Sequence, residues 1–386
     1  MKIKKILFIS ASRSDFYLQK ILIDQMIKEK GFSLQLLVTG NHHLKEFGYS
    51  IKDVYKERYN FIKEIKIPNN IKKLKINYIF SYLTERISNQ FIKNRPDVII
   101  LFGDRYEMLS AATCSTFLNI PIIHLHGGEI TEGSIDNNIR HSITKMSHFH
   151  FVASNQYKKN VEQMGEEPKN IFNYGSLSAE RIRLMKKINY HNVKKIFNFK
   201  LDLEYFLICI HPNTIDQIET KNLINETIKS LKYFKNYNFV FTCPGFDSKY
   251  DYIIKKIRKF KSENPSKVFF DENIGGDLYL NIINYSSIVI GNSSSGIIDA
   301  PYFKKPTINI GNRQSGRLQE KSIINCKANK KEIIKSIKIA ISNNFKKRTN
   351  KIKRFYGNGN TSKKIIKQIK KINLDKVLIK RFFIKK

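Results

Sequence analysis

Residues 124–136, HLHGGEITEGSID, gather the side chains of this sequence that are best suited to moving protons. His124 and His126 alternate along a predicted strand and are expected to face the same side of it. Glu129 and Asp136 follow on a loop that enters a predicted helix. Carboxylates beside histidines can act as general acids and bases, because neighbours push the pKa values of such groups apart. A metal site made by the two histidines and Glu129 is an alternative, as is a helix-capping role for Asp136.

Two more titratable side chains follow the ends of predicted strands. Asp104 stands in the sequence GDRYE after a strand predicted over residues 97–102, where it would face a cleft. The alternative is an Asp that caps the next helix and pairs with Arg105. His211 ends another apolar strand, and Pro212 after it fixes a turn that would point the imidazole into the cleft. A structural turn histidine is the alternative for His211.

Small hydroxyl side chains after a later strand are suited to holding phosphate. The sequence GNSSSGIIDAP (residues 291–301) places Ser293, Ser294 and Ser295 at the start of a predicted helix. There they would offer backbone N–H and hydroxyl donors to phosphate oxygens. Asp299, one turn further, could accept hydrogen bonds from ribose hydroxyls. Among the local patterns, this one best supports a nucleotide diphosphate as the ligand.

Three arginines could complete such a site. Arg13 lies in the first predicted strand-to-helix turn, SASRSD, whose helix we expect Ser14 or Asp15 to cap. Arg313 and Arg317 follow the last predicted strand and add two guanidinium groups suited to a diphosphate. The chain lacks the glycine pattern GxGxxG, which argues against a dinucleotide-binding enzyme.

All of these positions depend on strands that alternate with amphipathic helices. Apolar residues recur at helical spacing in segments such as 16–30, 76–93, 136–146, 215–234 and 330–343. Strands are predicted over residues 5–10, 34–39, 97–102, 121–126, 150–153, 206–211, 239–242, 288–291 and 307–311. This alternation favours parallel sheets built from right-handed βαβ units, whose ligands bind at the carboxyl ends of the strands.

A polar, irregular stretch after residue 175 divides the series in two. We therefore predict an α/β protein with two doubly wound, Rossmann-like domains that face a cleft. Residues 1–177 would carry the acid/base groups, and residues 178–360 would bind the nucleotide. Residues 361–386 form a basic amphipathic helix and tail that should pack back on the first domain, with a membrane-surface anchor as the alternative.

The charge balance of the chain is unusual. Among 386 residues, 69 Lys and Arg stand against 33 Asp and Glu, which gives a formal net charge of +36. A nucleic-acid-binding protein is one interpretation, but the basic residues are spread along the chain and no recognition motif accompanies them. The four cysteines form no CxxC pair, and no apolar run suits a signal peptide or a membrane span. We expect a soluble, cytoplasmic protein with no nucleic-acid partner and no stable membrane insertion.

Four motifs in order indicate a family resemblance: GDRYE, HGGEITEGSID, RHSITKMSH (residues 140–148) and GNSSSGIIDAP. Together they resemble the hydrolysing UDP-N-acetylglucosamine 2-epimerases of bacterial sialic-acid pathways. They also resemble the related non-hydrolysing epimerases and the enzymes of legionaminic-acid synthesis. The resemblance implies a glycosyltransferase-B-like fold, with a sugar nucleotide held mainly by the second domain. We also expect a homodimer or a homotetramer.

The resemblance implies a reaction as well. Removal of the proton at sugar carbon 2 with anti elimination of UDP gives a 2-acetamidoglycal, to which water then adds with protonation on the other face. From UDP-N-acetylglucosamine, the expected products are N-acetylmannosamine and UDP, and no metal or redox cofactor is needed. The alternatives are the same reaction on a UDP- or GDP-linked 2,4-diacetamido-2,4,6-trideoxyhexose, and a non-hydrolysing 2-epimerase.

Individual residues match the motifs of this family. Asp104 and Asp136 match its acid/base carboxylates, and His211 matches the histidine of its cleft turn. The implied diphosphate, phosphate and ribose contacts are Arg13, Ser293, Ser294 and Asp299. Where some members have the pattern HxEGGE, this chain has His126 in place of the first Glu. The catalytic role at that position therefore passes to Glu129 or to His126 itself, and Glu129 is the preferred candidate.

Overall fold

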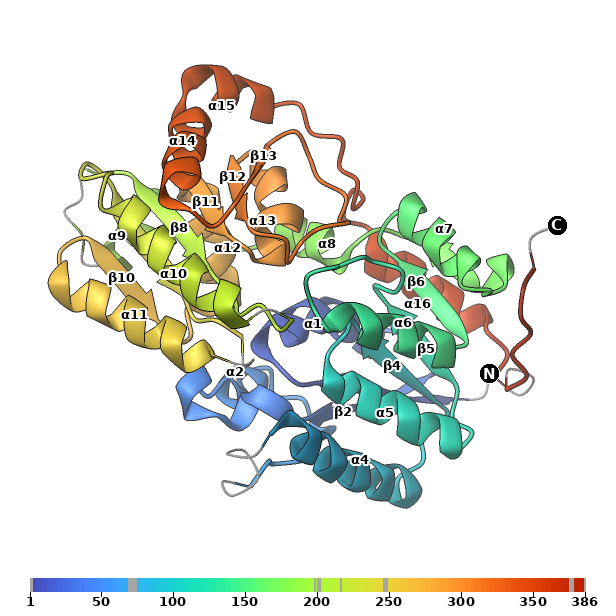
Figure 1. Ribbon diagram of the computed structural model, residues 1–386. Coiled ribbons are helices and arrows are strands. Elements are labelled where there is room, and N and C mark those ends of the chain that lie inside the picture. Colours follow the sequence, from blue (N-terminus) through green and yellow to red (C-terminus); the bar gives the residue numbers. More distant parts are fainter. Residues whose placement is uncertain are drawn as a thin grey trace.

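The computed structural model describes residues 3–68, 75–197, 199, 203–215, 217–245, 249–374 and 378–384. Two parallel β-sheets organise these residues, one in each half of the chain (Figure 1). The first sheet has seven strands, in the order β3-β2-β1-β4-β5-β6-β7. Their bounds are β1 (Lys4–Ser10), β2 (Phe32–Val38), β3 (Ile62–Glu64), β4 (Val98–Phe102), β5 (Ile122–Leu125), β6 (Phe149–Val152) and β7 (Ile171–Asn173).

The second sheet has six strands, in the order β10-β9-β8-β11-β12-β13. Their bounds are β8 (Tyr205–Cys209), β9 (Asn238–Thr242), β10 (Val268–Asp271), β11 (Ile288–Gly291), β12 (Thr307–Ile310) and β13 (Ile323–Cys326). In each sheet the strand order reverses next to the first strand, between β1 and β4 and between β8 and β11. Such reversals leave a crevice at the carboxyl ends of the strands, which is where ligands bind in doubly wound sheets.

Helices cover both faces of the first sheet. In chain order they are α1 (Arg13–Ile27), α2 (Ile51–Lys56), α4 (Ile76–Lys93), α5 (Tyr106–Phe117), α6 (Asp136–Met146), α7 (Asn155–Gln163) and α8 (Leu177–Leu184). On one face, α1 packs on β1 through Phe16 and Phe8. On the other face, α4 and α5 pack through a separate core that includes Leu83, Phe91 and Met108. Burial on both faces explains why the central strands are continuous apolar runs.

The second sheet is covered in the same way. Its helices are α9 (Tyr190–Phe197), α10 (Gln217–Leu231), α11 (Tyr250–Glu263), α12 (Gly276–Tyr285), α13 (Ser294–Ile298), α14 (Lys330–Ile341) and α15 (Asn343–Thr349). Ile224 of α10, Ile257 of α11 and Ile337 of α14 share one core. Phe197 of α9 and Leu280 of α12 belong to the core on the opposite face. Short 3-10 helices connect some of these elements: η1 (Gly40–His43), η2 (Lys45–Phe47), η3 (Pro168–Asn170) and η4 (Ala300–Phe303).

The last helix, α16 (Thr361–Lys371), returns to the first half of the chain. Its Ile365 and Ile366 are buried in the same core as Phe8 of β1. The ammonium group of Lys4 donates to the carbonyl of Ile369, at 2.7 Å. In Figure 1 this red helix lies among the blue and green elements of the first sheet. The domain boundaries placed at residues 177 and 360 stay predictions.

Every strand predicted from the sequence is present, and the missed strands share one property. These strands, β3, β7, β10 and β13, are the four edges of the two sheets. An edge strand pairs on one side only, so its residues need not form a continuous apolar run. The burial of β13 illustrates this, because none of its four residues is fully buried. Among the helices of the described residues, none combines the length and the apolar character that crossing a bilayer needs.

Candidate active site

A cavity of about 360 Å³ lies where the carboxyl ends of the two sheets face each other. With the exception of His124, the structure brings the predicted site residues to its lining. They are Arg13, Asp104, His126, Glu129, Asp136, His211, Ser293, Ser294, Ser295, Asp299, Arg313 and Arg317. The loops after β4 and β5 supply Asp104, Glu129, Asp136 and His126. The segments after β8, β11 and β12 supply His211, the serines, Asp299 and two of the arginines.

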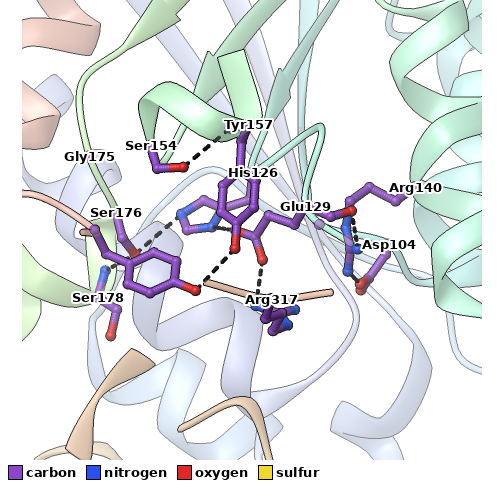
Figure 2. Close-up of polar contacts among 12 residues, drawn as sticks. Asp104, His126, Glu129, Arg140, Ser154, Tyr157, Gly175, Ser176, Ser178 and Arg317 are labelled. Atoms are coloured by element: carbon purple, nitrogen blue, oxygen red, sulfur yellow. Dashed lines mark hydrogen bonds and ion pairs between the residues drawn. The ribbon is translucent and has the colours of Figure 1, made fainter. Parts of the chain in front are cut away.

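Asp104, directly after β4, is held by a residue from another element. It accepts a hydrogen bond from Arg140 of α6, and this ion pair lies at the cavity wall (Figure 2). The predicted partner, Arg105, instead donates to the buried carboxylate of Glu107, at 2.7 Å. The residue that caps α5 is Arg105, with no side-chain capping bond, so Asp104 does not serve as a helix cap. Both parts of that alternative are therefore wrong, and the carboxylate of Asp104 faces the cavity.

His126 and Glu129 form a buried pair that a third residue completes from the second half of the chain. Figure 2 shows the imidazole of His126 between Glu129 and Ser176. Nδ1 of His126 lies 2.7 Å from one carboxylate oxygen of Glu129, and Nη1 of Arg317 donates to the other at 2.5 Å. Burial alone would raise the pKa of Glu129, but the charge of Arg317 and the bond to His126 outweigh it and lower the pKa.

The ionised Glu129 decides which nitrogen of His126 carries the proton. A carboxylate only accepts hydrogen bonds, so Nδ1 of His126 must be the donor. In the neutral ring Nε2 is then an acceptor, and it lies 3.4 Å from the hydroxyl of Ser176. The backbone at His126 is left-handed, with φ of +65°, a conformation that residues other than glycine rarely adopt.

His124 has a different environment, although both histidines were expected to face the same side. Nε2 of His124 lies 2.7 Å from the carbonyl of Gly103, and Nδ1 lies 3.1 Å from the hydroxyl of Thr144. Burial lowers the pKa of His124 to about 3. Only His126 of the two lines the cavity. Because both nitrogens of His124 already bond to the protein, the two histidines and Glu129 do not form a metal site. Among the described residues, no cluster of three or more His, Cys, Asp or Glu side chains could hold a metal ion.

Asp136 is the first residue of α6 and is not a helix cap. The capping position is Ile135, whose side chain makes no capping bond, and the hydroxyl of Ser134 accepts from the backbone N–H of Asp136 at 3.3 Å. Instead, the carboxylate of Asp136 lies 3.7 Å from the guanidinium of Arg313. The loop before Asp136 contacts the second half closely, because the backbone N–H of Glu132 donates to the carbonyl of Ser315 at 3.2 Å. A carboxylate from the first sheet and a guanidinium from the second thus meet in the cavity.

His211 follows β8 and is neutral. The backbone N–H of Gly245 donates to its Nδ1 at 2.9 Å, so the ring proton resides on Nε2. Burial, together with the charges of Arg313 and Arg13, lowers the pKa of His211 to about 3. The side chain of Asn292 holds the backbone of His211 with a bond of 2.7 Å. His211 therefore presents a fixed hydrogen-bond donor rather than a titrating base.

The hydroxyl segment after β11 is held together by its own hydrogen bonds. Ser293 caps α13 and accepts from the backbone N–H of Ser295, at 3.3 Å. The hydroxyl of Ser295 lies 2.5 Å from that of Tyr279 on α12. Asp299 accepts a hydrogen bond from the hydroxyl of Ser178, and burial raises the pKa of Asp299 to about 6. Hydroxyl groups and one carboxylate therefore line the wall that the second sheet contributes.

Arg13 reaches across the cleft from the first turn. The helix that it begins is capped by Ser12, whose hydroxyl accepts from the backbone N–H of Asp15 at 3.4 Å. The prediction that Ser14 or Asp15 caps this helix was therefore wrong. The guanidinium of Arg13 donates to the side chain of Asn273, at 3.0 Å, in the segment between β10 and α12.

Several residues of the cavity lining were not predicted from the sequence. Ser176 follows β7, an edge strand that was not predicted, so Ser176 was not recognised as a residue at the end of a strand. Arg140 stands in a recognised motif, but its pairing with Asp104 has no local signal. Arg181 and Tyr279 come from α8 and α12, and nothing in their spacing distinguishes them from other helical residues.

Comparison with known proteins decides the family. The model of the UDP-N-acetylglucosamine 2-epimerase family matches residues 24–370. The protein belongs to this family. It is 38% identical over 384 residues to the GDP/UDP-N,N'-diacetylbacillosamine 2-epimerase (hydrolyzing) of Campylobacter jejuni, with 99% of each chain covered. It is 35% identical over 344 residues to the polysialic acid biosynthesis protein P7 of Escherichia coli, with 89% of this chain and 87% of that protein covered.

Solved structures of epimerases share the fold of this member of the family. The UDP-GlcNAc 2-epimerase of Neisseria meningitidis bound to UDP-GlcNAc superposes with a TM-score of 0.79 at 17% identity, covering 95% of this chain and all of the other. The Methanocaldococcus jannaschii enzyme in complex with UDP-GlcNAc and UDP gives a TM-score of 0.77 at 19% identity, with the same coverage. The predicted family and the predicted α/β fold, with two doubly wound, glycosyltransferase-B-like domains, are confirmed.

Proposed function

We propose that the protein is a hydrolysing 2-epimerase of a nucleotide-linked 2-acetamido sugar. The observation that carries this proposal is a single cavity with two kinds of wall. Carboxylates and the imidazole of His126 from the first sheet face hydroxyl groups, a neutral imidazole and guanidinium groups from the second. One wall is suited to proton transfer and the other to a diphosphate. The Campylobacter jejuni relative, whose name specifies a hydrolysing epimerase, supports this choice of reaction.

The proposed reaction has two steps. A base removes the proton from carbon 2 of the sugar while the bond from carbon 1 to the diphosphate oxygen breaks. The electron pair of the broken C–H bond becomes the double bond of the glycal, and the nucleotide leaves with the electrons of the C–O bond. Water then adds its hydroxyl group to carbon 1, and an acid returns a proton to the opposite face of carbon 2. Asp104, Asp136 and His126 are the proposed groups for these proton transfers.

The wall from the second sheet would hold the nucleotide. In this proposal Ser293, Ser294 and Ser295 donate to phosphate oxygens, as hydroxyl groups and backbone N–H groups commonly do. Asp299 accepts from the ribose hydroxyls, and Arg313 neutralises charge on the diphosphate. The donor proton on Nε2 of His211 would stabilise the departing diphosphate, which gains negative charge as the bond to carbon 1 breaks. Arg13 is the proposed contact from the first sheet.

Two sugars are candidates for the substrate. A nucleotide-linked N,N'-diacetylbacillosamine is favoured, because relatives named for that sugar match almost the whole chain at 38% and 26% identity. UDP-N-acetylglucosamine is the second candidate. It is supported by the 35% identity with the polysialic acid biosynthesis protein and by a Neisseria meningitidis UDP-N-acetylglucosamine 2-epimerase that is 30% identical over 88% of each chain. The proposed chemistry is the same for both, since only the substituents at carbons 4 and 6 differ.

A donor panel in deuterated water tests the proposal. The purified protein is incubated with UDP-N-acetylglucosamine and with the UDP- and GDP-linked diacetamido sugars, and the products are identified by NMR. We expect free nucleotide and a free sugar inverted at carbon 2 that carries deuterium there. A product without deuterium at carbon 2 would overturn the mechanism. A sugar that stays linked to the nucleotide would identify a non-hydrolysing epimerase instead.

The proposal also covers the cofactor requirement, the location and the oligomeric state of the protein. Turnover should not need added metal or redox cofactor, so treatment with a chelator should leave the rate unchanged. A cytoplasmic location is proposed in keeping with the four cysteines, all of which are free thiols. The proposed assembly is a homodimer or a homotetramer, and light scattering during size-exclusion chromatography would measure it.

A further inference from the structure

We propose that His126 is the base of the elimination step and that Glu129 and Arg317 are positioning residues that set its tautomer from both sides of the cleft. This inference rests on the proposed function and assigns roles within the same site. Nε2 of His126 would take the proton from carbon 2, while the electron pair of that C–H bond forms the glycal double bond and the nucleotide leaves. The sequence alone suggested Arg317 as a nucleotide contact and left the roles of Glu129 and His126 undivided.

The first support is the order of the hydrogen bonds. Arg317 donates to Oε2 of Glu129 at 2.5 Å, and Oε1 of the same carboxylate lies 2.7 Å from Nδ1 of His126. Both oxygens of Glu129 are thus occupied, so this carboxylate does not face a substrate as a free base. Its effect on the cavity passes through the imidazole, whose Nε2 is an acceptor with the hydroxyl of Ser176 3.4 Å away. A carboxylate that orients a histidine in this way is a recurrent arrangement around catalytic bases.

The second support is the backbone at His126. Its φ of +65° is unfavourable for a side chain with a Cβ atom, and such conformations persist where the surroundings impose them. Here the backbone N–H of His126 donates to the carbonyl of Phe151 on β6, at 2.9 Å. The ring of Phe102 packs against the imidazole, with 4.7 Å between ring centroids. The fold therefore holds His126 in a strained position at the cavity lining, where 10% of its side chain stays exposed.

The third support is the close contact of the two loops that carry the pair. Gly316, next to Arg317, has φ of +83°, and a Cβ atom there would lie 2.3 Å from the side chain of Ile130, next to Glu129. A Cβ atom on Gly133 would lie 2.7 Å from the Cα atom of Arg313. These contacts pack the loop that carries Glu129 directly against the loop that carries Arg317. The bond between the two side chains therefore depends on how the two halves of the molecule pack on each other.

The test compares nucleotide binding with turnover. In Arg317→Met and in Glu129→Gln we expect kcat to fall at least about tenfold, whereas the Kd for UDP measured by calorimetry should change less than about threefold. The double variant should be no slower than the slower single variant, because residues that act as one unit are not additive. Arg313→Met, which changes the neighbouring arginine of the same loop, serves as the matched control and should weaken UDP binding about tenfold or more.

Two results would overturn the positioning role. One is a tenfold loss of UDP affinity in Arg317→Met, which would make Arg317 a nucleotide contact. The other is an additive loss of kcat in the double variant. Arg317→Lys keeps the charge and should retain more activity than Arg317→Met. If Arg317→Met does not fold, Arg317→Lys and Glu129→Gln are compared instead.

A spectroscopic measurement separates this inference from the proposed function. With 15N-labelled histidine, the signal absent from His126→Gln identifies the imidazole of His126, and its shifts report which nitrogen carries the proton. We expect a protonated Nδ1 and an unprotonated Nε2 in the intact protein, and a changed pattern in Glu129→Gln. An Nε2-protonated ring would overturn the inference whatever the enzyme turns over. The expected pattern in a protein that releases nucleotide from no donor would contradict the proposed function, and the role of His126 as a base with it.

Discussion

The imidazole rings of His126 and His211 line the same cavity with their protons on opposite nitrogens. Nδ1 of His126 donates to Glu129, whereas Nδ1 of His211 accepts from the backbone N–H of Gly245. The nitrogens left for a ligand therefore differ in kind, because Nε2 of His126 accepts and Nε2 of His211 donates. An elimination from a sugar nucleotide needs both functions, one at carbon 2 and one at the departing diphosphate.

The donor role of His211 predicts how its variants behave. His211→Ala should lower kcat by about a hundredfold, the usual cost of removing one donor from a developing negative charge. His211→Gln keeps an N–H donor and should lose less. Because burial and the charges of Arg313 and Arg13 lower the pKa of His211 to about 3, its ring should not titrate in rate profiles measured above pH 5. A step in the profile that disappears in His211→Gln would contradict this role.

Asp136 offers a clean test of proton transfer by a carboxylate. Its side chain is 27% exposed and bonds to no helix end, so Asp136→Asn should leave the melting temperature nearly unchanged. If Asp136 transfers a proton, kcat should fall by about two orders of magnitude or more. Steady-state kinetics and thermal unfolding on the same preparation check both statements. A near-normal rate would mean that Asp136 only contributes charge near Arg313.

Asp104 should behave differently because its partner is buried. The side chain of Arg140 is 2% exposed, and Asp104→Asn would leave its charge without a counter-charge. We expect a loss of stability of about 1–3 kcal/mol, the usual cost of a buried donor without its partner, together with a loss of turnover of about a hundredfold or more. Thermal unfolding distinguishes the two carboxylates, since only the variant at Asp104 should melt at a lower temperature. Equal melting temperatures for both variants would argue against the ion pair with Arg140.

Asp299 predicts a pH dependence of stability. Burial raises its pKa from 3.8 to about 6, so folding favours the protonated form. The stability that depends on this proton is fully present below pH 3.8 and is lost as the pH rises through 6. Asp299→Asn does not ionise, and its melting temperature relative to the unchanged protein should therefore increase by a few degrees between pH 5 and pH 7.5. A difference that is constant with pH would show that Asp299 does not titrate in this range.

The candidate site could be predicted from the sequence because of a geometric property of parallel sheets. Loops at the carboxyl ends of neighbouring strands meet at one edge, so motifs after predicted strands converge even when they are far apart in the chain. Asp104, His211 and Ser293 were found in this way. The interior strands were found by their apolar runs, and the edge strands were missed because half-covered strands lack such runs.

The partners of these residues could not be predicted in the same way. Asp104 pairs with Arg140 of α6 rather than with its chain neighbour Arg105, and this choice depends on how α6 packs against α5. The bond between Glu129 and Arg317 joins two halves of the chain and has no local pattern at all. Sequence spacing locates functional groups at the ends of strands, but tertiary packing decides which charges meet.

The return of α16 to the first sheet has a consequence for how the protein is made. Ile365 and Ile366 cover the same core as Phe8, near the start of the chain. A ribosome that has released residues 1–177 has therefore exposed a half-finished layer, with the apolar surface of α1 still open to solvent. The first half of the molecule reaches its final form only after α16 has been synthesised as well.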